Sequence, residues 1–253
     1  MTEVDVERQG SLMTITINRP AARNAIALTT MEQLEQALDR VAAEEVSVLI
    51  LRGAGDRAFV SGGDLKELAA LRTMEQASAM AVRMRRLLDR LVNLPMPTIA
   101  ALNGHALGGG AEVALACDLR LAAEDVTVAF NQAQLAIMPA WGGVERLVEL
   151  VGRSAAMQLL LTRNRLTASQ AEVLGLVNLT FPRSSFDLGV AAFARQIADL
   201  PTAVSRSIKA TVEAVRPNSH PNLESSAVQA FARLWVADDH WAAADELRRA
   251  QRV

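Results

Sequence analysis

A chain of 253 residues suits one large domain with an accessory piece, and it is too short for two full catalytic domains. Apolar residues make up 51% of it and charged residues 21%, which excludes a chain that is disordered in its main state. Lys and Arg number 26 against 28 Asp and Glu, so the net charge of -2 lacks the basic excess of a nucleic-acid-binding protein, and we predict no nucleic-acid partner.

The N-terminal part of the sequence alternates short strands with helices. Alternating apolar residues over 4–17, with a turn at Gly10, predict a β-hairpin. Thr29 and Glu32 have the spacing of a capping box, so we predict that they begin a helix over 30–43. Short apolar runs at 46–51 and 99–102 predict buried strands, and a helix over 74–93 separates them.

The C-terminal part begins with the same alternation and then becomes helical. A predicted helix over 111–117 follows a glycine cluster, and the runs 119–121, 126–130 and 177–181 predict strands around a helix over 144–161. Helices are predicted from about residue 187 onward, with a Pro, Asn and Ser stretch at 216–221 joining two of them. This pattern predicts an α/β core of residues 1–186 with largely parallel strands, followed by a helical region of residues 187–253.

The cysteine and histidine content and the hydropathy of the sequence restrict the possible disulfides, metal sites and cellular location. A single cysteine, Cys117, allows neither an internal disulfide nor a cysteine zinc site, and we expect it to be a core thiol. The three histidines lack metal-ligand spacing, so we predict no metal, and His105 is interpreted as structural. No signal-like N-terminus and no run of eighteen apolar residues occurs, which predicts a cytoplasmic protein without a membrane partner.

Two glycine-bearing loops, at 58–65 and 103–112, each follow a predicted strand. Glycine permits positive φ and close approach of the backbone, so N–H groups in such loops can point at a ligand atom. The second loop also opens a helix, whose N-terminus favours developing negative charge. Two N–H groups aimed at one carbonyl oxygen would form an oxyanion hole, whereas turns required only by packing are the alternative. Neither loop has dinucleotide-binding or P-loop spacing.

Glu112 is the carboxylate beside the second glycine loop, in the otherwise apolar segment 111–116. An acid that merely stabilises the helix N-terminus is the structural alternative. Burial would raise its pKa toward the range of a general acid or base, and we therefore interpret Glu112 as functional.

Ordered blocks of this sequence resemble the enoyl-CoA hydratase/isomerase family, also called the crotonase superfamily. The blocks are Asn18-Arg19-Pro20 through Asn24-Ala25, Phe59 through Lys66, Pro97 through Asp118, and Pro139 through Leu147. The resemblance covers most of the core, from about Ile15 to about Val177. It implies an α/β spiral of ββα repeats with a C-terminal helical subdomain that assembles homotrimers or dimers of trimers. It also implies acyl-CoA substrates, as in fatty acid metabolism, with CoA entering as part of the thioester and no separate cofactor.

The resemblance further implies roles for individual residues. The backbone N–H groups of Gly63 and Gly109 match the oxyanion hole, and Glu112 matches the first catalytic glutamate of the hydratases. Residues 63–66 match the segment along the pantetheine and adenine of CoA, and Arg23 matches a position that often faces the CoA phosphates. The predicted binding residues for CoA and the acyl group are Arg23, Ala25, Gly63, Asp64, Leu65, Lys66, Gly109, Gln132, Pro139 and Trp141. Trp141 either walls the acyl pocket or packs in the core.

The second catalytic glutamate of the hydratases has no match here. Counting back from Pro139 places Gln132 at its position, and the distance from Phe130 suggests a two-residue deletion. Glutamine can hold a water molecule but cannot take its proton. The Pro-x-Trp-Gly-Gly block resembles a subgroup that includes short-chain malonyl-type CoA decarboxylases, while Glu145 is a reserve candidate for the second acid. We predict a hydratase-like lyase and leave decarboxylation, isomerisation and non-catalytic acyl-CoA binding open.

Two further sequence features concern the surface of the protein. A basic helix face is interpreted as solvated or subunit-facing, and it contains Arg83, Arg85, Arg86 and Arg90. The last helices carry apolar residues that are unusual for a free surface, namely Phe231, Leu234, Trp235, Val236 and Trp241. We take this apolar set to predict oligomerisation through the C-terminal region.

Overall fold

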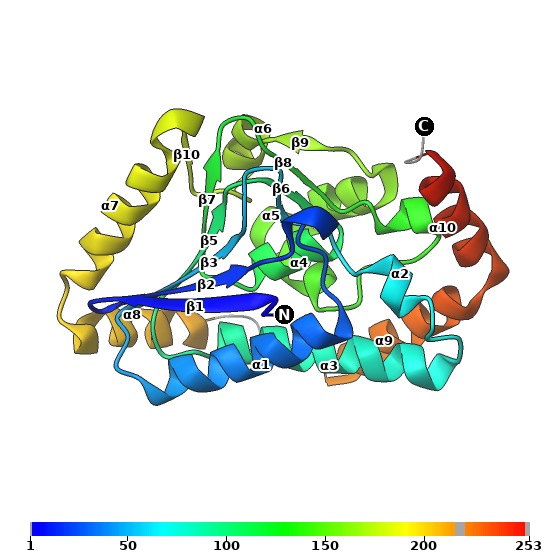
Figure 1. The fold of residues 1–253 in the computed structure, drawn as a ribbon, viewed down its shortest axis with the longest axis horizontal. Coiled ribbons are helices and arrows are strands. Elements are labelled where there is room, and N and C mark those ends of the chain that lie inside the picture. Colours follow the sequence, from blue (N-terminus) through cyan, green and yellow to red (C-terminus); the bar gives the residue numbers. More distant parts are fainter. Residues whose placement is uncertain (1, 216–220, 251–253) are drawn as a thin grey trace.

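The computed structural model describes residues 2–215 and 221–250. A six-stranded sheet has the order β1-β2-β3-β5-β7-β10, in which only β1 and β2 pair antiparallel (Figure 1). Its strands are β1 (Val4–Gln9), β2 (Leu12–Ile17), β3 (Val48–Gly53), β5 (Thr98–Leu102), β7 (Leu119–Ala123) and β10 (Leu179–Phe181). The inner strands are nearly continuous apolar runs because helices cover both faces of a parallel sheet.

A second, four-stranded sheet has the order β4-β6-β8-β9. Its strands are β4 (Ala58–Val60), β6 (His105–Leu107), β8 (Thr127–Ala129) and β9 (Leu166–Thr167). Each of β3, β5 and β7 passes into a strand of this sheet, and a helix follows, which gives the ββα repeat. The predicted crotonase-like spiral is therefore confirmed, and the loops that follow β4 and β6 lie on neighbouring parallel strands.

Helices surround both sheets. In chain order they are α1 (Leu28–Ala43), α2 (Leu65–Leu68), α3 (Met74–Val92), α4 (Gly109–Leu115), α5 (Gly143–Thr162), α6 (Ala168–Val173), α7 (Phe186–Ala198), α8 (Thr202–Ala214), α9 (Pro221–Val236) and α10 (Asp238–Ala250). Short 3-10 helices are η1 (Pro20–Ala22), η2 (Gln132–Leu135) and η3 (Arg183–Ser185). None of the helices in the described parts of the chain has both the length and the apolar character needed to span a bilayer.

Several predicted boundaries are shifted by a few residues, and at two of them a specific hydrogen bond shows why. Helix α1 begins at Leu28, and the hydroxyl of Thr30, not Thr29, accepts the N–H of its N-cap residue Ala27 at 3.1 Å. The carboxylate of Glu3 in turn accepts hydrogen bonds from both threonine hydroxyls. The last predicted strand begins at Leu179 instead of residue 177, since Val177 still donates its N–H to the end of α6.

The C-terminal helices wrap around the core. In Figure 1, α7 and α8 lie at the left end of the molecule, and α9 and α10 lie at the right end. The side chains of Phe231 and Trp235 are only 4% and 2% exposed, in an α9 that packs along α3 of the same chain. The premise that these residues form an uncovered face is thus wrong. The division at residue 186 stays a prediction, and the predicted linker falls on residues 216–220, outside the described residues.

Candidate active site

The two glycine loops meet at the ends of β4 and β6. Ile26 forms a parallel bridge with Gly63, in which Ile26 donates to the carbonyl of Gly62 and Asp64 donates to the carbonyl of Ile26, both at 2.8 Å. The bridge therefore uses the groups on either side of Gly63 and leaves its N–H pointing away. A Cβ atom added to Gly62, whose φ is 110°, would lie 3.5 Å from the backbone nitrogen of Gly109, so the loops are adjacent.

Gly109 is the first residue of α4, where helix geometry leaves the backbone N–H groups without helical acceptors. The preceding Gly108 has a φ of 55° and donates its N–H to the carbonyl of Ala129 at 2.8 Å. In the part of the chain that the structure describes, no protein group accepts a hydrogen bond from the N–H of Gly63 or Gly109. Both donors are thus open to a ligand, as an oxyanion hole requires. Their function stays a prediction.

The indole ring of Trp141 lies across both glycines. A Cβ atom added to Gly109 would lie 2.2 Å from Cζ3 of the ring, and one added to Gly63 would lie 3.7 Å from its Cη2 and Cζ2 atoms. Trp141 is itself only 5% exposed. The ring explains why position 109 admits no side chain, and it places Trp141 against both predicted oxyanion donors. The ring is packed, which is one of the two sequence alternatives, and its role as a wall of the acyl pocket stays a prediction.

The carboxyl group of Glu112 lies at the centre of the site and is almost fully buried. One oxygen, Oε2, accepts the backbone N–H groups of Trp141 at 2.8 Å and Gly143 at 2.9 Å. The other, Oε1, accepts the side-chain amide of Gln132 at 3.0 Å. Only glycine fits at position 143, because an added Cβ atom would lie 2.4 Å from Cγ of Glu112. The structure thus brings Glu112 together with Gln132 and with the predicted block 139–147, which contains Trp141 and Gly143.

Burial raises the pKa of Glu112 from 4.5 to about 7 because the charged form loses its hydration. The N–H donors of Gly143, Trp141 and Gln132, and the positive charge of Arg146, lower the pKa and offset part of this effect. A carboxyl group that is half ionised near neutral pH can both accept and return a proton.

Arg146 was missed by sequence analysis, and it fixes the turn that supports Glu112. Its guanidinium donates to the carbonyl of Trp141 at 2.9 Å and pairs with Asp89 at 2.5 Å, while the side chain is almost fully buried. The charge therefore stays close to the acid. The one sequence signal is an arginine inside the apolar pattern of the helix predicted over 144–161.

Gln132 begins η2 and is 7% exposed. Its Nε2 donates to Glu112, whereas its buried Oε1 has no hydrogen-bond partner among the described residues. The residue selected by counting back from Pro139 thus lies beside the acid, and its match to the second catalytic glutamate stays a prediction. Glu145, the reserve candidate, instead forms an ion pair with Arg85 at 2.8 Å. None of the groups hydrogen-bonded to Glu112 is a carboxylate.

The predicted CoA-binding segments 23–25 and 63–66 are joined by the Ile26–Gly63 bridge. Asp64 accepts the N–H of Lys66 at 3.1 Å and pairs with Arg19 at 2.9 Å, so it organises the loop. Arg23 and Lys66 are exposed, and neither forms an ion pair with another described residue. Three other predicted binding residues are partly or largely buried, namely Ala25, Leu65 and Pro139. Sequence analysis assigned no role to Arg19, which also pairs with Glu3 and Glu67.

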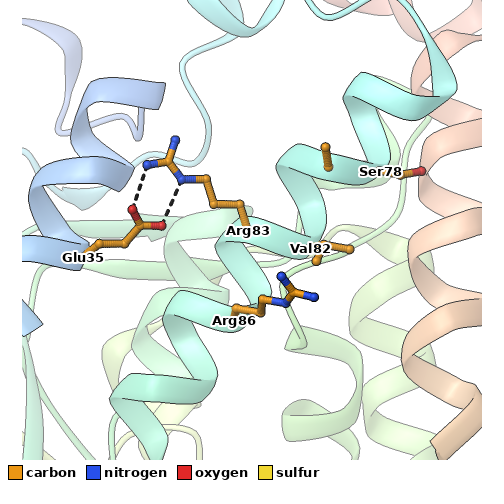
Figure 2. A pocket seen from close by; sticks show the side chains of 6 residues that line it. Glu35, Ser78, Val82, Arg83 and Arg86 are labelled. Atoms are coloured by element: carbon orange, nitrogen blue, oxygen red, sulfur yellow. Dashed lines mark hydrogen bonds and ion pairs between the residues drawn. The ribbon is translucent and has the colours of Figure 1, made fainter.

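The basic face of α3 is mostly neutralised. Arg83 forms two hydrogen bonds to Glu35 of α1, at 2.9 and 2.8 Å, and Arg90 pairs with Asp39. Figure 2 shows a surface hollow beside the Arg83–Glu35 pair. It is lined by Glu35, Ser78, Ala79, Val82, Arg83 and Arg86 and contains none of the predicted site residues. Arg85 of the same helix is only 8% exposed, so the expectation that this side chain is solvated is wrong.

His105 and Cys117 have structural settings, as predicted. Nδ1 of His105 accepts the backbone N–H of Thr127 at 3.0 Å, which links β6 to β8. Burial raises the pKa of the Cys117 thiol to about 12, so it stays protonated at neutral pH.

Solved structures with the same architecture define the class of protein. The enoyl-CoA hydratase of Bacillus anthracis is 31% identical, with a TM-score of 0.82 over 98% of this chain and 97% of that chain. The enoyl-CoA hydratase/isomerase family matches residues 7–240, and the chain belongs to this family.

Two relatives named as hydratases show similar identity over the core. The short-chain-enoyl-CoA hydratase of Clostridium acetobutylicum is 37% identical over 179 residues, which cover 70% of this chain and 68% of the relative. The 2,3-dehydroadipyl-CoA hydratase of Escherichia coli is 39% identical over 183 residues, which cover 72% and 70%.

The raised pKa of Glu112 predicts a pH-dependent effect of Glu112→Gln on stability. Between pH 4.5 and about 7 the folded chain binds more protons than the unfolded chain, so the wild type loses stability as pH rises through this window. Glutamine carries no charge at either pH. Relative to wild type, the variant should therefore gain about 3 kcal/mol in unfolding free energy between pH 4.5 and pH 8. Chemical denaturation at fixed protein concentration measures this, and equal differences at both pH values would refute the raised pKa.

Proposed function

We propose that this chain is an acyl-CoA enzyme that stabilises a thioester enolate with the N–H groups of Gly63 and Gly109 and transfers a proton through Glu112. The observation that carries the proposal is a buried carboxyl group, whose pKa burial raises to about 7, in the same site as two backbone donors that no described group accepts from. Such donors stabilise negative charge as it develops on the thioester oxygen, and a low-dielectric setting strengthens the effect.

Hydration of a 2-enoyl-CoA is the reaction that we propose first. Ionised Glu112 takes a proton from water while the water oxygen bonds to C3, and the π electrons move to the thioester oxygen. Glu112 then returns the proton to C2 of the enolate, which restores the carbonyl group. The unpaired Oε1 of Gln132 supplies an acceptor that can hold the water beside the carboxylate. The hydratase names of the two relatives support this choice.

Decarboxylation of a malonyl-type CoA is the second candidate, and the absence of a carboxylate at Gln132 favours it. The bond to the substrate carboxylate breaks, CO2 leaves, and the electron pair forms the same enolate. Protonated Glu112 then donates its proton to the α-carbon, so no water-activating base is needed. Isomerisation would move one proton between C2 and C4 through the same group.

Mass spectrometry of a panel of acyl-CoA thioesters separates these reactions. Hydration adds the mass of one water molecule, decarboxylation removes that of CO2, and isomerisation leaves the mass unchanged. The pH dependence gives an independent criterion. Hydration needs ionised Glu112, so kcat/KM should rise with pH through about 7, whereas decarboxylation needs the protonated form and should decline through the same range. A chain that binds these thioesters but converts none would be a non-catalytic acyl-CoA-binding protein.

The CoA portion is proposed to lie along residues 63–66. Arg23 and Lys66, which pair with no acidic group among the described residues, provide two positive charges for its phosphates, and the Ile26–Gly63 bridge holds their segments together. No separate cofactor enters this proposal. A cytoplasmic location stays a prediction.

Assembly as a homotrimer or dimer of trimers is also proposed, and α8 now provides the supporting surface. Exposed apolar side chains recur every three or four residues along α8 and its C-cap residue, at Val204, Ile208, Val212 and Val215, with exposures of 45, 55, 59 and 77%. An apolar stripe of this kind is typical of an interface. Light scattering at micromolar concentration should give three or six times the chain mass of 27.2 kDa. A monomer would contradict the proposal.

A further inference from the structure

The last two helices carry a compact cluster of three rings, which we call the C-terminal ring cluster: Trp235, His240 and Trp241. The His240 ring lies 4.6 Å from the centroid of each tryptophan, and the two tryptophan rings are 5.5 Å apart. The guanidinium of Arg72 lies 3.6 Å from the centroid of Trp241 and covers it from outside. His240 is fully buried although it can carry a charge, which calls for a specific reason.

Two hydrogen bonds connect this cluster to two segments outside the C-terminal helices, the loop at Leu71 and the 3-10 helix η2. Nε1 of Trp235 donates to the carbonyl of Leu71 at 2.8 Å, and Nδ1 of His240 lies 2.7 Å from the carbonyl of Leu135. A carbonyl oxygen only accepts, so His240 carries its proton on Nδ1. Its buried Nε2 then has no partner among the described residues. A charged imidazole would leave a second donor unsatisfied there, and burial lowers the pKa of His240, so the ring is neutral.

Both of these segments also contact residues of the candidate active site. Leu71 donates its N–H to the carbonyl of Leu68, and a Cβ atom added to Gly63 would lie 2.8 Å from Cδ1 of Leu68. Leu135 is the last residue of η2, and Gln132, the first residue of η2, donates to Glu112. One ring cluster therefore contacts the Gly63 side of the site through Trp235 and the Gln132 side through His240.

We propose that His240 is a positioning residue of the active site: its Nδ1–H holds η2 in place, and η2 in turn holds the amide of Gln132 against Glu112. Among the described residues, His240 forms its hydrogen bond to the carbonyl of Leu135 and not to the acid or to Gln132, so it acts through the 3-10 helix. The inference rests on the proposed function only in treating Glu112 as the proton-transfer group. Arg146 is the charged group that faces Glu112, and Arg72 is the one that faces His240.

Titration of Glu112 in the absence of substrate tests this directly. The protonated carboxyl band in infrared spectra is assigned to Glu112 by its loss in Glu112→Gln. His240→Phe keeps a stacked ring but removes the donor, so η2 should relax and the apparent pKa of Glu112 should rise as it does in Gln132→Met. The double variant should show no further rise, because His240→Phe acts by displacing η2 and so by loosening the Gln132–Glu112 hydrogen bond that Gln132→Met already removes. His240→Asn keeps an N–H close to the Nδ1 position and should titrate like wild type.

Trp235→Phe is the matched control, since it breaks the cluster's bond to Leu71 on the other side of the site and should leave the Glu112 titration unchanged. If His240→Phe does not fold, His240→Gln replaces it, because its amide reaches the Nε2 position and not Nδ1. Where turnover is measurable, His240→Phe should lower kcat about tenfold with little change in KM, the pattern of a displaced catalytic group.

The proposal would be overturned if the donor-lacking variants lower the melting temperature but leave the pKa of Glu112 where it is in wild type. It would equally be overturned if the pKa rises caused by His240→Phe and Gln132→Met add in the double variant. Because the titration needs no substrate, a chain that converts no acyl-CoA would refute the proposed function without deciding this one.

Discussion

Glu112→Gln is expected to lower kcat/KM by about 10²- to 10⁴-fold, because glutamine keeps the shape of the side chain but cannot transfer a proton. The variant should still fold. Its carbonyl oxygen can accept the N–H groups of Trp141 and Gly143, and its amide can donate to the unpaired Oε1 of Gln132. Steady-state kinetics on the converted acyl-CoA measures the loss.

Binding of CoA thioesters should survive this substitution, since it depends on the loop 63–66 and on Arg23. Calorimetry with a non-reacting thioester measures the affinity separately from turnover. Glu145→Gln is the matched control, because it changes the same group in the neighbouring helix, where Glu145 pairs with Arg85. A comparable loss of activity in the control, or a loss of affinity in Glu112→Gln as large as the loss of turnover, would contradict these roles.

Gln132→Glu should produce the second large effect, a gain of about 10²-fold or more in hydration of crotonyl-CoA. A correctly placed general base contributes roughly 10²- to 10⁴-fold, and position 132 already lies within hydrogen-bond distance of Glu112. The two carboxyl groups would then titrate as a coupled pair, with one of them protonated near neutral pH. That state supplies one acid and one base.

Gln134→Glu provides a control of identical chemistry, since Gln134 lies two residues along η2 and is exposed. It should leave the rate unchanged. If wild type already hydrates crotonyl-CoA efficiently and Gln132→Glu changes nothing, another residue supplies the base, and the single-glutamate account is wrong.

The features that depend on local sequence pattern could be predicted from the sequence. Apolar periodicity predicted the alternation of strands and helices, the family resemblance implied the ββα repeats, and glycines next to strands marked the loops of Gly63 and Gly109. Glu112 was recognisable because a carboxylate in an apolar segment needs a reason. Counting back from Pro139 selected Gln132, and the structure places this residue within hydrogen-bond distance of Glu112.

What the sequence could not predict depends on contacts between distant segments. Arg146 meets Asp89 across 57 residues, and His240 meets Leu135 across 105 residues. The apolar residues of α9 suggested a subunit interface because pattern alone does not say which surface covers them. Here α3 of the same chain covers Phe231 and Trp235. A long-range contact also lies at the start of α1, which differs from the predicted one. There the carboxylate of Glu3 accepts hydrogen bonds from the hydroxyls of Thr29 and Thr30.

Exchange of the α-protons of butyryl-CoA in D2O tests the central claim most directly. This saturated thioester cannot be hydrated, isomerised or decarboxylated, so exchange reports only enolate formation and proton transfer. Wild type should incorporate deuterium at the α-carbon, detected by mass spectrometry, with a rate that rises through about pH 7, and Glu112→Gln should reduce the rate to that of the solution without enzyme. Exchange that is absent in wild type, or equally fast in Glu112→Gln, would contradict the assignment of Glu112 as the group that moves the proton.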